Sequence, residues 1–227
     1  MNYPRFNELF WEFSSFIEGL HALYLDSIVG YELLNERLEK HQKQTRDFLG
    51  QHEYATQEFQ DTCSIAYEHL GGGDHRLVSM SPLMRQGELR RCIEPNGQNA
   101  QSLGNLLVVS AYAYWEEYLR IEIGKVKGVI PADAGNTNKV RDILNQEVVS
   151  DFWGDLRHLR NSIVHSSGLA NSEVAKCKVI TWFKPRERIL LNYQMVRALF
   201  LCMGAYDNEV HKMQFPPRFI QIPPGDC

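Results

Sequence analysis

The residues whose types and spacing are best suited to chemistry are Arg160, Asn161 and His165. Arginine presents a planar set of N–H donors that binds phosphate and stays charged. Histidine can accept and release protons near neutral pH. The amide of Asn161 both donates and accepts hydrogen bonds, so it can orient a phosphate or a water molecule. These three residue types together predict cleavage of RNA without a metal ion.

An amphipathic helix over residues 151–166 has to position these side chains. Its apolar residues recur at i, i+4, i+7 and i+11: Phe152, Leu156, Leu159 and Ile163. Ser150 or Asp151 is suited to cap its start, and Gly168 to end it. At about 100° per residue, Arg160 falls beside the apolar stripe and His165 on the opposite side. The helix is therefore expected to carry one polar sector with Arg157, Arg160, Asn161 and His165.

The charge around this helix differs from that of the whole chain. Lys and Arg number 24 against 28 acidic residues in 227, a formal charge of −4, which argues against coating a nucleic-acid duplex by bulk charge. Residues 151–190 instead hold seven basic and four acidic side chains, a local charge of +3. His158 adds a further potential cation, so a phosphate partner is indicated. A plain solvated helix face is the ordinary alternative.

Composition restricts the other kinds of site. The five cysteines are Cys63, Cys92, Cys177, Cys202 and Cys227, without any CxxC spacing. They predict neither a disulfide framework nor a zinc site, and no metal or cofactor is expected. The N-terminus lacks the pattern of a signal peptide, and no apolar run is long enough for a bilayer. A cytoplasmic protein without membrane contact is therefore expected.

Helical periodicity covers most of the chain and predicts an all-α, up-down helical bundle with four to five core helices. Helices are expected over 4–48, 53–70, 102–127, 137–144 and 192–212, with an irregular segment over 74–100. Residues 178–191 alternate β-branched and aromatic side chains around Lys184-Pro185-Arg186-Glu187, which predicts a small β-hairpin. Residues 1–95 form an N-terminal helical region, either separate or part of the same bundle. Residues 96–227 form the second domain and end in a proline-rich tail.

Two further groups of side chains are candidates for supporting roles. Glu116 and Glu117 follow Trp115 on the strongly apolar helix over 102–127, where a carboxylate is unusual. Each is expected either to pair with an arginine of the 151–166 helix or to face water. Lys176, Lys178 and Lys184 lie near the predicted hairpin and are expected to aid RNA docking or solubility.

The order of these features resembles that of a known family. An aromatic helix with glutamates, Ala111-Tyr112-Ala113-Tyr114-Trp115-Glu116-Glu117-Tyr118, precedes a helix that ends in Arg160-Asn161-Ser162-Ile163-Val164-His165. Over residues 98–213 this pattern is similar to prokaryotic members of the HEPN superfamily, the "higher eukaryotes and prokaryotes nucleotide-binding" group. The family motif is an arginine, four to six residues, then histidine, often with Asn, Asp or His after the arginine. Arg160, Asn161 and His165 match all three positions.

The resemblance implies a helical bundle, a homodimer and a composite site where two motif helices meet. It also implies a metal-independent endoribonuclease of toxin–antitoxin or anti-phage systems, with an antitoxin such as a nucleotidyltransferase as a possible partner. His165 would act as base or acid, Arg160 would stabilise the phosphorane, and Glu116 or Glu117 would orient Arg160. Because Arg160 and His165 are expected to lie far apart around one helix, the two-fold axis would bring them together.

Two other interpretations stay open. Some family members lack nuclease activity, so the chain could instead be a non-catalytic module that binds RNA, a nucleotide or a partner protein. A plain helical scaffold is the third interpretation, and it predicts that Arg160 and His165 are solvated and unrelated to any interface.

Overall fold

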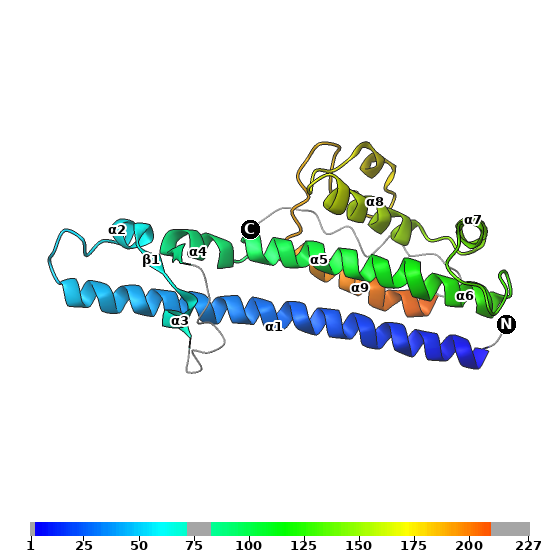
Figure 1. Cartoon of the computed structure of the whole chain (residues 1–227), viewed down its shortest axis with the longest axis horizontal. Helices are drawn as coiled ribbons and strands as arrows, with labels where there is room; N and C mark the ends of the chain where they lie inside the picture. Colours follow the sequence, from blue (N-terminus) through cyan, green and yellow to red (C-terminus); the bar gives the residue numbers. More distant parts are fainter. Residues whose placement is uncertain (1–2, 72–82, 210–227) are drawn as a thin grey trace. The chain divides into compact units, whose positions relative to one another are not determined.

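The computed structural model describes residues 3–71 and 83–209, and these are mostly helical (Figure 1). The predicted all-α fold is confirmed. A small antiparallel pair of two-residue strands, β1 (Ser64–Ile65) and β2 (Met84–Arg85), is the one sheet in the described ranges. The proline-rich tail lies outside the described residues.

The chain divides into two compact units. Of the described residues, 3–23 and 103–209 form one unit, and 24–71 with 83–102 form the other. Helix α1 (Tyr3–Leu49) contributes to both units and continues through Gly30 without interruption. The sequence had placed a boundary near residue 95 and had assigned the first residues to the N-terminal region. Residues 3–23 instead belong to the same unit as the motif helix.

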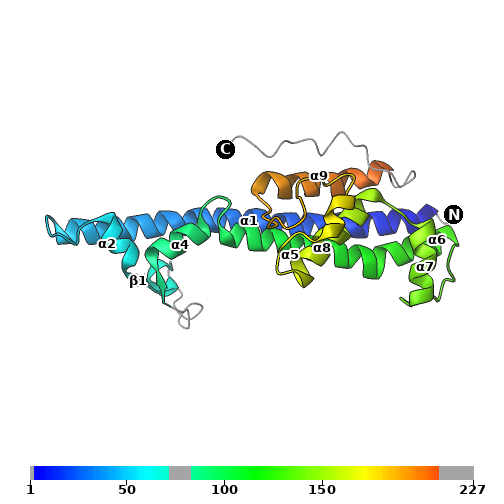
Figure 2. The ribbon, with the colours of Figure 1, turned by 90° about the horizontal axis from the view of Figure 1, so that it is seen from above.

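The unit that contains the motif helix is built on three helices that run lengthwise beside one another: the start of α1, α5 (Gln98–Tyr114) and α9 (Tyr193–Glu209) (Figures 1 and 2). Helix α5 continues without a break into a π-helical turn, η2 (Trp115–Leu119), and then into α6 (Arg120–Lys127). Helix α7 (Asn138–Glu147), α8 (Asp151–His165) and the short 3-10 helix η3 (Ser172–Lys176) complete it. The predicted cap of α7 is confirmed, because the Thr137 side chain accepts a hydrogen bond from the Val140 N–H.

Aromatic side chains fill the core of this unit and fix α8 against the long helices. The rings of Trp115 and Trp153 stack at 4.8 Å with 3° between their planes, and both are almost fully buried. Phe13 of α1 contacts Trp153 edge-on at 6.0 Å, and Phe16 stacks on Tyr114 at 4.1 Å. Such rings bury large apolar areas and prefer offset or edge contacts, so they restrict how α8 can lie.

The second unit has its own small core. The second half of α1 packs with α2 (Gln57–Thr62), α3 (Tyr67–Leu70) and α4 (Gln86–Ile93). Its buried cluster comprises Leu38, Ile65, Leu70, Leu89 and Ile93. The single helix predicted over 53–70 is thus interrupted by β1, because Ser64 and Ile65 pair with Arg85 and Met84. The segment predicted to be irregular contains the helix α4. This helix has only eight residues, which is too few for its buried residues to show a clear helical period in the sequence.

The predicted β-hairpin does not lie over residues 178–191, which contain no strand. The N–H groups that a hairpin would use bind elsewhere: those of Lys178, Val179 and Ile180 donate to the Asp155 carboxylate at 2.6–3.2 Å. The returning segment pairs with residues 168–170 instead, where the Ile189 N–H donates to the Gly168 carbonyl at 2.8 Å. The predicted turn over 184–187 is confirmed, with the Glu187 N–H donating to the Lys184 carbonyl.

Within residues 3–71 and 83–209, no helix is both long enough and apolar enough to cross a bilayer.

Asp155→Asn tests the role of the buried carboxylate, which is 3% exposed. The amide has no charge and only one acceptor oxygen, so the loop N–H groups lose charge-assisted bonds. We expect the free energy of unfolding to fall by about 1.5–3 kcal/mol, measured by urea denaturation. Asp151→Asn is the matched control, because its bond to Lys178 is exposed and its loss changes the midpoint little. Equal losses in the two variants would contradict this role of Asp155.

Candidate functional site

Helix α8 presents the motif at its C-terminal end. The apolar residues Phe152, Leu156 and Leu159 are fully buried, as the periodicity predicts. The polar residues beside this stripe are half-buried at Arg160 and Asn161 and exposed at His165. Gly168 adopts a φ of 80°, and its N–H donates to the Ser162 carbonyl, so the helix ends as predicted.

Arg160 contacts both Asn161 and His165 within a single chain. A guanidinium N–H of Arg160 donates to Asn161 Oδ1 at 3.0 Å, and the same nitrogen lies 3.2 Å from His165 Nε2. On an ideal helix the Cα atoms of Arg160 and His165 are about 140° apart around the axis and about 7.5 Å apart along it. The long arginine side chain spans this gap, so their contact does not need a second copy of the helix.

This contact defines the state of the imidazole. A guanidinium has only donors, so a hydrogen bond across this contact requires Nε2 as the acceptor and the ring proton on Nδ1. A guanidinium thus occupies the lone pair that a general base would use. Any group that binds the guanidinium more strongly, such as a phosphate, would release this lone pair.

A buried hydroxyl, which the sequence analysis missed, fixes the loop behind the motif. Ser162 has no exposed surface; its Oγ donates to the His158 carbonyl at 2.9 Å and accepts from the Asn171 N–H at 3.1 Å. With Asp155 it ties residues 171–180 to α8 from two positions. A sequence signal existed: both residues are polar at the edge of the predicted apolar stripe.

The two glutamates do not orient Arg160. Glu116 is bonded to Arg120 at 3.0 Å and accepts from the Tyr112 hydroxyl at 3.2 Å. Glu117 is exposed and binds Arg141 at 3.2 Å, as well as the Asn136 amide. The prediction that one of them supports Arg160 was therefore wrong, because both find cations within α6 and α7.

Within the described residues, the side chains of Arg157 and His158 make no hydrogen bond to Arg160, Asn161 or His165. Arg157 is exposed and lines a cavity at the other end of α8 with Glu116. Burial, reinforced by the charge of Arg157, holds the pKa of the His158 imidazole below its usual value. A neutral, half-buried imidazole is poorly suited to donate protons, so His158 fits a structural position better than a catalytic one.

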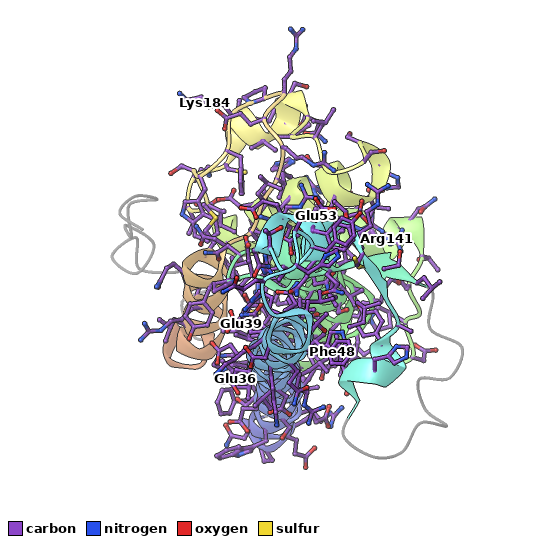
Figure 3. All side chains as sticks on the ribbon, turned by 90° about the vertical axis from the view of Figure 1, so that its left-hand side faces the viewer. Glu36, Glu39, Phe48, Glu53, Arg141 and Lys184 are labelled. Carbon is purple, nitrogen blue, oxygen red and sulfur yellow. The ribbon has the colours of Figure 1, made fainter. Side chains whose placement is uncertain are left out.

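The three lysines differ in how much charge they offer to a ligand. Lys176 binds Glu173 at 2.6 Å, and Lys178 binds Asp151 at 2.8 Å, so acids on the same surface balance both. Lys184 is exposed and makes no ion pair with the residues that the structure describes. It lies in the outer part of the 178–192 loop (Figure 3). The local surplus of +3 is therefore partly neutralised.

Other catalytic groups were sought in the described ranges. These ranges hold no cluster of three His, Cys, Asp or Glu side chains that could bind a metal. Burial raises the pKa of the Cys202 thiol to about 12, and burial with the nearby Asp155 does the same for Cys177. Neither thiol is a nucleophilic thiolate near neutral pH.

The chain was compared with known proteins in three ways. No family model, no curated protein and no solved structure matches it.

The tautomer of His165 tests the geometry at the motif. In ring nitrogen NMR of the neutral imidazole, we expect the proton on Nδ1, because Arg160 donates to Nε2. Arg160→Ala should remove this preference and shift the ring toward a mixture of tautomers. Arg141→Ala is the control and should leave the signals unchanged. A proton on Nε2 in the unaltered protein would refute the contact.

Proposed function

We propose that this protein is a metal-independent endoribonuclease of the HEPN type, acting as a toxin or in anti-phage defence. The observation that carries the proposal is the contact of Arg160 with both Asn161 and His165 at the end of α8. A phosphate ligand, a proton acceptor and an orienting amide are the groups that RNA cleavage by its own 2′-hydroxyl requires. The family name rests on the motif resemblance alone.

The contacts suggest an order of events. The scissile phosphate takes the N–H that Arg160 gives to His165, which frees Nε2 to accept the 2′-hydroxyl proton. The 2′-oxygen bonds to phosphorus, and the bond from phosphorus to the 5′-oxygen breaks. The leaving oxygen takes a proton, and the products are a 2′,3′-cyclic phosphate and a 5′-hydroxyl. Arg160 and Asn161 neutralise and hold the phosphorane.

A homodimer would supply the second proton donor. One His165 cannot be the base and the acid of the same step, whereas the His165 of a second copy in its imidazolium form can protonate the leaving oxygen. Exposed apolar side chains flank the motif, with Val164 47%, Leu169 49% and Leu190 44% exposed. Apolar side chains of this kind favour self-association. A nucleotidyltransferase antitoxin is a further proposed partner.

An RNA cleavage assay with EDTA present tests the function. We expect the purified protein to cut RNA and leave cyclic phosphate ends. His165→Ala should lower the rate about 10²–10⁴-fold by removing the base. Arg160→Ala should lower it about 10²–10³-fold by removing charge stabilisation.

Arg141→Ala is the matched control, because this arginine lies outside the motif and binds Glu117. It should retain full activity. Activity that survives in His165→Ala would refute the proposal. Intact RNA in every lane, with binding lost only in Arg160→Ala, would instead support the non-catalytic binding module.

The oligomeric state tests the dimer separately. We expect a dimer in sedimentation equilibrium, and Val164→Arg should shift it to monomer while helical circular dichroism stays unchanged. Leu201→Arg, at an apolar residue of α9 that is 51% exposed, is the control and should leave the dimer intact. A monomer in the unaltered protein would contradict the composite site.

A further inference from the structure

A cavity of about 280 Å³ lies at the start of α8, at the opposite end from His165. Its walls come from the end of α5 with the turn η2, from the end of α7 and from the first turns of α8, which lie near one another in Figure 1. The polar groups that face it include Arg120, Asn145, Ser150 and Arg157. This size is at the lower end of ligand pockets and suits a small molecule.

Ser150 is a buried donor without a partner. It is 7% exposed and occupies the N-cap position of α8, yet its side chain makes no capping bond. Its Oγ has no hydrogen-bond partner, although the residue lines the cavity. Buried hydroxyl groups are nearly always bonded, so this one at the cavity wall offers a hydrogen-bond donor to a ligand.

The charges around the cavity favour an anion. The buried guanidinium of Arg120 donates to Glu116 at 3.0 Å, to Asn145 at 2.9 Å and to the Val148 carbonyl at 3.1 Å. Glu116 is thus matched by Arg120. Arg157 makes no ion pair with the described residues, and Glu173, whose pKa it helps to lower, acts on it only at longer range. The positive end of the α8 dipole adds to the charge of Arg157.

The remaining wall of the cavity is apolar and includes part of the π-helical turn η2. Trp115 and Glu116 belong to η2, and such π-turns inside α-helices recur at functional sites. The stacked rings of Trp115 and Trp153, together with Val148 and Val149, line the cavity beside the charged groups. A ligand here would combine an anionic head with a compact apolar body.

We propose that this cavity binds a small organic oxyanion, a phosphate monoester or carboxylate with an aromatic or short aliphatic body. Ser150 and Arg157 bind the anionic group of the ligand near the start of α8. Trp115 and Trp153 contact its apolar part. Ser150 and His165 are about 20 Å apart along the helix axis. The binding site is therefore separate from the RNA-cleaving motif and does not rest on the proposed function.

Isothermal titration of the full chain tests this site with phenyl phosphate, benzoate and inorganic phosphate as probes. We expect phenyl phosphate or benzoate to bind, and their relative affinities identify whether the site prefers a phosphate or a carboxylate. Inorganic phosphate should bind more weakly because it lacks an apolar group. Arg157→Ala and Ser150→Ala should each weaken binding about tenfold to hundredfold. Arg141→Ala is the matched control and should bind as the unaltered protein does.

Two results would overturn the proposal: no binding of either organic anion at millimolar concentration, or binding that both cavity variants leave unchanged. Circular dichroism verifies that the variants fold. Arg157 is exposed, so Arg157→Ala retains the fold and carries the test even where Ser150→Ala does not. RNA cleavage measured on Ser150→Ala separates this site from the motif, because Ser150 lies about four helical turns from His165.

Discussion

The carboxylate of Asp155 organises the surface around the candidate site. Three consecutive backbone N–H groups, at residues 178–180, converge on it from a loop that has no sheet partner of its own. Buried polar backbone requires such partners, and a buried carboxylate requires such donors, so each satisfies the other. Ser162 repeats the arrangement about two turns further along α8, within the motif segment. The loop from residue 168 to residue 192 is therefore held by side chains of α8.

Helix α8 consequently serves two different chemical environments. Its first turns face the π-turn η2 through the Trp115–Trp153 stack, where cations and a buried hydroxyl surround a cavity. Its last turn carries Arg160, Asn161 and His165 at the surface. Because the middle of the helix is held by apolar burial and by Asp155, the two ends are rigidly spaced. A ligand bound in the cavity would therefore not contact His165.

The cations of this unit differ in their partners. Acids match Lys176, Lys178 and Arg120, through Glu173, Asp151 and Glu116, whereas Lys184 makes no ion pair with the residues that the structure describes. Arg160 instead donates to two neutral acceptors, an amide and an imidazole. A guanidinium that lacks a carboxylate partner keeps its attraction for an incoming phosphate. This difference could not be predicted from the sequence, where all of these residues contribute equally to the local charge.

The sequence by itself determined the helical character, the limits of α8, the cap at Thr137 and the three polar residues at the end of α8. These features depend on local periodicity and capping, which act within a few residues. Tertiary structure decided the partners of Glu116 and Glu117, the division of α1 between two units, and the irregular course of residues 178–191. Each depends on residues far apart along the chain, as when the Asp155 carboxylate takes the N–H groups that a hairpin would have used.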